Sequence, residues 1–367
     1  CWLVTFAVSA RLFLTLYHIP HLALGAEMAQ DYLDRTRVYS FSQFFGTVGS
    51  AGFGFLMLTL FFPTTEEFSH GLLNSHGYGP FSIAAAIGIV VSISLCVAGT
   101  AREIPHLPAA NFKKVERLNP RRLLREITTA FKNHSYRMLV GGLFCAVILL
   151  GIEGTFMVYM YVHFWGMATE HMRWIGPIVL CALPFSVLLA PVLTKHLDKR
   201  RTLIGLSVVI IVCNNMMICL RLFTDWLPEN GSAELLAMLL AFIFTSGLAG
   251  PAIMITLNSM FADISDEQEL LTHERQEGII FSARSFAFKA GGAFATILGG
   301  IGLDLIDFPR GAAPGEVSPD VLFNLGVIAG PATSIVGLAV LAFYFGYRLD
   351  RARIAEIQLE LAARRTR

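Results

Sequence analysis

The sequence predicts an all-α membrane protein with nine transmembrane helices, and three observations support this fold class. Hydrophobic residues make up 54% of the 367 residues and charged residues only 15%, and the mean hydropathy is +0.60, far from the balance of a soluble domain. Apolar stretches of about 20 residues recur along the chain, and an α-helix of that length crosses the hydrocarbon core of a bilayer. Lysine and arginine gather in alternate loops, which is typical of cytoplasmic loops in membrane proteins.

The apolar stretches define the predicted helices in order along the chain. Each must be helical, because lipid offers no hydrogen-bond partner to a free backbone N–H or C=O group. They lie near residues 1–26, 42–62, 80–100, 138–164, 173–195, 202–222, 234–262, 278–306 and 321–347.

The charges of the loops orient these helices. Most of the 28 lysines and arginines lie in residues 35–37, 102–137 and 195–201, at Arg275 and in the tail from Arg348. Because cytoplasmic loops carry the excess of positive charge, we expect these segments and the C-terminus to face the cytoplasm. The sequence therefore predicts a multi-pass protein of the cell membrane, in a bacterium the inner membrane.

The long basic loop predicts the domain organisation. Six predicted helices follow this loop and three precede it, and an odd number of spans with a cytoplasmic C-terminus places Cys1 outside, although the sequence begins with neither an initiator methionine nor a signal peptide. We therefore expect the first three helices of a six-plus-six transporter to precede Cys1. The expected parts are the remainder of the N-terminal bundle at 1–100, a basic linker at 101–137, the C-terminal six-helix bundle at 138–347 and a cytoplasmic tail at 348–367.

Within the linker, a short pattern predicts an amphipathic helix. Asn119-Pro120 can cap a helix start, and Leu123, Leu124 and Ile127 follow at helical spacing. This helix could lie along the membrane surface. The alternative is a plain surface helix that joins the two halves.

Several function classes are disfavoured by the sequence. The net charge of +1 gives no indication of a nucleic-acid partner, and the six cysteines show no C-x-x-C spacing that would indicate a metal site or a disulfide framework. No nucleophile and base, metal-ligand cluster or phosphate-binding glycine loop has the spacing that an enzyme requires. We therefore expect neither an enzyme nor a bound cofactor or metal.

Polar residues in the first predicted span are candidates for a binding site, because ionisable side chains at membrane depth are costly unless they are paired or hydrated. Arg11 and His18 are two helical turns apart, with Thr15 between them and His21 one turn further on. Pro20 frees backbone carbonyls in the same region. These residues could line an aqueous cavity, or the histidines could be a hydrogen-bonded pair packed between helices.

Three further charged residues lie within predicted spans and away from the span ends. Lys289 is near the middle of the eighth span, and Arg284, five residues earlier, points about 140° away around the helix. A lysine at this depth can bind a substrate, take part in proton coupling or form a structural ion pair. Glu153 lies mid-span in the fourth segment, and Asn214 in the sixth predicts an interhelical hydrogen bond rather than a ligand.

Two stretches of sequence resemble a known family. The first comprises residues 17–27 (YHIPHLALGAE) with residues 31–37 (DYLDRTR), and the second comprises residues 260–266 (MFADISD) with residues 274–282 (ERQEGIIFS), continuing to Lys289. They resemble the signatures of the glycoside-pentoside-hexuronide:cation symporters, the melibiose-permease-like branch of the major facilitator superfamily. The resemblance covers the chain from the fourth helix of that family onward.

This resemblance implies twelve helices in two bundles, with the substrate held between them and access alternating between the two sides. Lys289 matches a lysine of the family's cavity, and Thr15 matches a helix-4 position of its cation site. Three positions depart from the sugar permease: His18 replaces an aspartate, Leu22 a sugar-stacking tryptophan, and Gln43 a sugar-binding arginine. A histidine in place of a carboxylate favours protons over sodium as the coupling ion.

Charged residues at the expected cytoplasmic helix ends resemble the family's conformational charge network. Opposite charges from the two halves could pair there and hold the outward-facing state, or they could be solvated loop charges that contribute about 0–1 kcal/mol per pair. The candidates are Asp34, Arg35, Asp263, Asp266 and Arg275.

Three functional hypotheses follow. The first is a monomeric secondary transporter that couples a cation, H⁺ in preference to Na⁺, to symport of a sugar, glycoside or related polar solute. The second keeps the fold and changes the substrate to an amphipathic lysolipid, which the apolar Leu22 and a lysine for a head-group phosphate would suit. The third is a truncated or non-transporting membrane protein.

Overall fold

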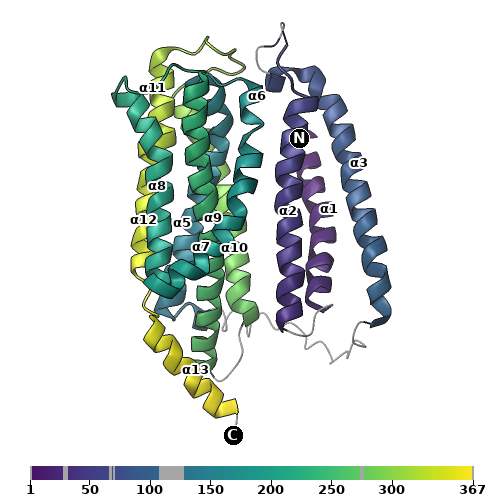
Figure 1. Cartoon of the computed structure of the whole chain (residues 1–367), viewed down its shortest axis with the longest axis vertical. Coiled ribbons are helices and arrows are strands. Elements are labelled where there is room, and N and C mark those ends of the chain that lie inside the picture. Colours follow the sequence, from purple (N-terminus) through teal and green to yellow (C-terminus); the bar gives the residue numbers. More distant parts are fainter. Residues whose placement is uncertain are drawn as a thin grey trace.

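The computed structural model describes residues 2–27, 32–65, 68, 71–106, 128–272 and 277–365, and this described part consists of helices and connecting loops with no strand. The helices form two groups that stand side by side (Figure 1). We call the end that carries residues 101–106, the loop near Asp198 and the C-terminal helix the basic end, at the bottom of Figure 1, and the opposite end the far end. The all-α membrane fold predicted from the sequence is confirmed.

The N-terminal group contains α1 (Trp2–Glu27), α2 (Tyr32–Leu60) and α3 (Ser75–Thr100). A short helix, η1 (Gly71–Leu73), precedes α3 at the far end, and η2 (Ala101–His106) follows it at the basic end. The start of α3 is capped by Asn74, whose side-chain oxygen accepts a hydrogen bond from the backbone N–H of His76 at 2.9 Å. These helices contain most of the first three predicted spans, but α2 and α3 begin at Tyr32 and Ser75, before the predicted starts at 42 and 80.

The C-terminal group contains the remaining long helices, two of which are extended or interrupted by a π-helical turn. Its elements are α5 (His134–Tyr159) with η3 (Met160–Phe164), α6 (Thr169–Met172), α7 (Ile175–Leu197), α8 (Lys199–Phe223), α9 (Ala233–Thr272), α10 (Glu277–Leu305), α11 (Pro319–Val327) with η4 (Ile328–Ala332), α12 (Thr333–Phe345) and α13 (Arg351–Arg365).

Seven helical segments within the described residues are long and apolar enough to span a membrane. The other two predicted spans correspond to α1 and α2, which contain the shorter apolar stretches Val4–Tyr17 and Phe44–Leu60. The linker pattern after Asn119 lies outside the described residues, so its amphipathic helix stays a prediction.

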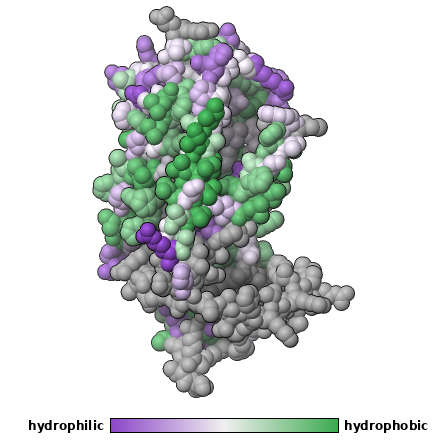
Figure 2. Space-filling model, turned by 90° about the vertical axis from the view of Figure 1, so that its right-hand side faces the viewer, coloured by the Kyte–Doolittle hydropathy of each residue, from purple (hydrophilic) through white to green (hydrophobic). Residues whose placement is uncertain are grey.

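The outer surface has the polarity that a bilayer requires. Figure 2 shows the molecule from the side of α3, with hydrophobic side chains over the middle and hydrophilic ones at the far end. On α3 the side chains of Ile83, Val90 and Leu95 are exposed by 64%, 64% and 68%. Such a belt would be unfavourable in water, and it indicates contact with lipid.

α5 packs closely against α10 in the C-terminal bundle. Val147 lies beside Gly291, and Thr155 lies beside Gly299, so the two helices run parallel and in step. A methyl group added at Gly299 would lie 2.7 Å from Cγ2 of Thr155, whereas the neighbouring Gly300 has no atom within 4 Å of such a group. The glycine at 299 therefore sets the distance between these helices.

We expect Gly299→Ala to destabilise the protein by about 1–3 kcal/mol, because the added methyl group overpacks the α5–α10 contact. Gly300→Ala is the matched control and should be neutral or stabilising by up to about 1 kcal/mol, since alanine is the better helix former. Heating the purified variants in detergent and measuring the monodisperse fraction by size-exclusion chromatography compares them. Equal midpoints for the two variants would contradict this account of the packing.

Candidate functional site

The two helical groups meet along α2 and α7, and a cavity of about 600 Å³ lies at this contact. Small residues of α2 at helical spacing form one wall, and Gly46 and Gly54 there have open space where a side chain would stand. Residues of α5, α6 and α7 form the other wall. The lining residues are Gly46, Thr47, Ser50, Ala51, Gly54, Leu58, Met157, Met172, Arg173, Ile175, Gly176 and Val179.

One charged side chain, that of Arg173, belongs to this lining. Arg173 is the C-cap residue of α6, separated from α7 by Trp174, and its guanidinium carbon lies 5.7 Å from the ring centre of Trp174. Its Nε atom is inaccessible and has no hydrogen-bond acceptor within the described residues. An arginine that lines a cavity can bind an oxygen atom of a ligand through its terminal N–H groups, because guanidinium is weakly hydrated and always charged.

Contacts between the two groups close the cavity toward the far end. The backbone N–H of Thr64 donates to Oε1 of Glu170 at 2.6 Å, and that of Gly71 donates to Oγ1 of Thr169 at 3.0 Å. Beneath them the rings of Phe55 and Trp174 lie edge to face at 5.9 Å. A ligand in the cavity is therefore covered on the far-end side.

A second polar group lies inside the C-terminal bundle. Glu153 of α5 is partly buried, and its carboxyl group is hydrogen bonded to the side-chain amide of Asn214 on α8. The Asn214 side-chain oxygen accepts a hydrogen bond from the Ser246 hydroxyl of α9 at 3.2 Å. The structure thus brings together Glu153 and Asn214, which the sequence analysis treated separately, as a candidate ligand and an interhelical contact.

The candidates on α1 are less closely grouped. The Thr15 hydroxyl donates to the backbone oxygen of Arg11 at 2.7 Å, so this bond stays within the helix, and Arg11 is exposed. His21 stacks on Tyr17 at 5.5 Å, and its Nδ1 atom lies 3.5 Å from Sγ of Cys96 on α3. The side chains of His18 and Gln43 lie outside the described part, so their roles stay predictions.

The two basic candidates on α10, Arg284 and Lys289, have different surroundings, as their spacing around the helix predicts. Arg284 is partly buried and its guanidinium carbon lies 5.2 Å from the ring centre of Phe288. Lys289 is exposed on the bundle surface. Because α5 and α10 run in step, with Gly151 beside Ala295, Lys289 lies about 12 Å closer to the basic end than Glu153, so the two do not pair directly.

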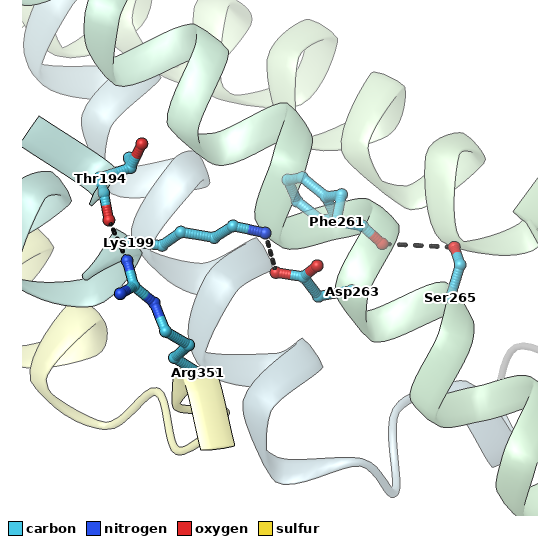
Figure 3. Close-up of polar contacts among 6 residues, drawn as sticks. All are labelled: Thr194, Lys199, Phe261, Asp263, Ser265 and Arg351. Carbon is cyan, nitrogen blue, oxygen red and sulfur yellow. Dashed lines mark hydrogen bonds and ion pairs between the residues drawn. The ribbon is translucent and has the colours of Figure 1, made fainter. Parts of the chain in front are cut away.

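The basic end carries a cluster of charges that joins four helices (Figure 3). Lys199 of α8 contacts Asp263 of α9, with Nζ 2.6 Å from Oδ2, and the two side chains are 26% and 6% exposed. Arg351 of α13 donates to the backbone oxygens of Thr194 and Lys195 at 2.8 Å each, at the C-terminal end of α7. A cation is favourable there because the last carbonyls of a helix lack backbone partners.

For the predicted charge network, this cluster gives Asp263 a partner within its own half of the molecule. Asp266 is partly buried. The side chains of Asp34 and Arg35 and the whole of Arg275 lie outside the described residues, so pairing between the two halves stays a prediction. The sequence analysis missed Arg173 and Lys199 as site residues, although a lone arginine next to a loop without other lysine or arginine was a signal for the first.

Comparison with known proteins also indicates a membrane transporter. The sequence profile of the family described as MFS/sugar transport protein matches residues 1–351. The chain is 25% identical over 248 residues to "Uncharacterized symporter sll1374" of Synechocystis sp. (strain ATCC 27184 / PCC 6803 / Kazusa), an alignment that covers 66% of this chain and 43% of that protein. It is 26% identical over 350 residues to "Uncharacterized symporter YjmB" of Bacillus subtilis (strain 168), covering 94% of this chain and 69% of that protein.

The chain thus spans less than half of the first relative's length. The superfamily indicated by the motifs at residues 17–37 and 260–289 is confirmed, and the names of both relatives agree with a symporter. This chain belongs to the MFS/sugar transport protein family, the transporters of the major facilitator superfamily.

Proposed function

We propose that this protein is a cation-coupled symporter of a small polar solute, a sugar, glycoside or related compound, which it binds in the cavity between α2 and α7. The observation that carries the proposal is that both halves of the molecule line this cavity and that one of them contributes Arg173. A cavity of about 600 Å³ is within the usual range of sites for small molecules. An alternating-access mechanism needs a binding cavity that is lined by both halves of the molecule, as this one is.

The contacts at the far end suggest how access would alternate. A solute that touches both walls can change the free-energy difference between two arrangements of the halves, because its contacts differ between them. Opening toward the far end requires the bonds from Thr64 and Gly71 to Glu170 and Thr169 to break. The positive charge of the basic end supports placing that end on the cytoplasmic side of the cell membrane. The proposed transporter acts there as a monomer.

The apolar part of the cavity wall favours a second candidate substrate. Met157, Ile175 and Val179 line it beside Arg173, and such a wall suits an amphipathic molecule with an anionic head group, such as a lysolipid. The two candidates share the transport mechanism and differ in the chemistry of the solute.

Uptake into proteoliposomes tests the proposal. The purified protein would be offered glycosides, pentosides, hexuronides and lysolipids in turn, with luminal pH followed by a dye and sodium followed as tracer. We expect accumulation of one solute class together with movement of one cation. Absence of uptake and of solute exchange across the panel, by protein shown to be folded and inserted, would overturn it.

A further inference from the structure

Glu153 lies at the border between the packed interior and the cavity. On α5 its neighbours Ile152 and Phe156 are buried in the bundle core, with 6% and 1% exposure. On its other side Gly154 has open space around it, and Met157, one helical turn from Glu153, lines the cavity. The backbone of Glu153 is therefore about 6 Å, along the helix axis, from that of a residue that lines the cavity.

The surroundings of this carboxyl group contain few titratable side chains. α5 contacts α9, α10 and α12, and α8 carries its partner Asn214. In these four helices the stretches 209–218, 241–251, 290–303 and 333–343 contain one titratable side chain, Cys213. The nearest charges along these helices are Arg221 of α8, Lys289 and Asp304 of α10, and across the cavity wall Arg173. Within the described residues, no cation forms an ion pair with Glu153.

A carboxylate at membrane depth without a cation is strongly unfavourable, so the group gains by binding a proton. Asn214 can serve both forms of the carboxyl group. Its amide donates to the carboxylate, and its oxygen is held in place by the Ser246 hydroxyl at 3.2 Å.

We propose that Glu153 binds the coupling proton, which it exchanges with water in the cavity between α2 and α7. The inference rests on the proposed symport function and names its ion and the site of that ion. When the cavity opens to the side of higher proton concentration, the carboxylate takes a proton from hydronium and becomes neutral. When it opens to the other side, the O–H bond breaks, the proton passes to water, and the remaining carboxylate accepts hydrogen bonds from Asn214.

The test compares Glu153→Gln, Glu153→Asp and the control Glu234→Gln, which alters an exposed glutamate in the first turn of α9. Each would be reconstituted in proteoliposomes and assayed for proton-driven accumulation, for solute-dependent change of luminal pH and for solute exchange without a gradient. Glutamine mimics the protonated form and cannot release a proton. We expect Glu153→Gln to lose accumulation and the pH change by roughly tenfold or more while exchange stays within about twofold of the wild type.

Glu153→Asp should keep the pH change, and Glu234→Gln should behave as the wild type. In infrared spectra of the wild type, a protonated-carboxyl band should be present that Glu153→Gln lacks. Proton movement by Glu153→Gln, wild-type uptake that requires sodium, or loss of exchange together with accumulation in Glu153→Gln would each overturn the inference. Failure of the proposed function is distinguishable, because the wild type would then neither exchange nor accumulate any solute.

Discussion

Replacing Arg173 with alanine should raise the apparent KM for the transported solute by roughly 10- to 150-fold, because a hydrogen bond from a charged donor contributes about 1.5–3 kcal/mol to binding. Arg173 lines the cavity between the two halves, and its Nε atom has no acceptor within the described residues. Initial rates of uptake into proteoliposomes over a range of solute concentrations would measure the change. Arg173→Lys should fall between alanine and the wild type, since an ammonium group keeps the charge but loses the planar donors.

Arg310→Ala is the matched control for this prediction. Arg310 lies near the far end, and its side chain is 92% exposed. If Arg173→Ala and Arg310→Ala left KM equally unchanged, Arg173 would be removed from the solute site. The thermal stability of Arg173→Ala should stay close to that of the wild type, which separates lost binding from lost folding.

Replacing Lys199 with methionine should destabilise the protein by about 3 kcal/mol or more, because it leaves the carboxylate of Asp263 buried without a cation. The Asp263 side chain is only 6% exposed and that of Lys199 is 26% exposed. Asp263→Asn should cost less, about 1–2 kcal/mol, since the remaining lysine can turn its ammonium group toward water. Thermal midpoints of the variants in detergent would rank them.

The double variant Lys199→Met with Asp263→Asn gives the decisive comparison. If the pair acts as one unit, the double variant should be more stable than the sum of the two single effects predicts. Additive effects, or a Lys199→Met variant as stable as the wild type, would show that the contact contributes little. Arg353→Ala is a suitable control, because its ion pair with Glu356 on α13 joins side chains that are 48% and 62% exposed.

The positions of the helices could be predicted because each span has a signal of its own in the sequence. An apolar stretch of sufficient length is enough to locate α3 and α8, and the structure has both helices at the positions that the hydropathy indicated. The family could also be predicted, since its motifs at residues 17–37 and 260–289 are local. Helix extensions beyond the membrane, such as the end of α9 at Thr272, were not predicted, because their polar residues show no apolar periodicity.

Contacts between helices could not be predicted in the same way. The bond between Glu153 and Asn214 joins residues 61 positions apart on two helices, and neither residue carries a local mark of the other. The pairing of Lys199 with Asp263 depends on how α8 packs against α9. This packing cannot be obtained from the sequence of either helix alone. The place of Arg173 in a cavity likewise follows from the contact of α2 with α7, and not from the residues next to it in the sequence.

The hydrogen bonds at the far end have a consequence for the populations of the two arrangements. Both donors, at Thr64 and Gly71, are backbone N–H groups, so the side chains at those positions can vary without loss of the bonds, whereas the acceptors are the side chains of Glu170 and Thr169. A bond to a charged acceptor and one to a neutral hydroxyl together favour closure by about 2–4.5 kcal/mol. An equilibrium of that size leaves the opened arrangement as a minor species of roughly 0.05% to 3%, which a solute or a proton can still select. In the proposed symporter, the closure at Glu170 and Thr169 would then set how rarely the empty protein changes its arrangement, and so how little of the cation gradient it dissipates without a solute.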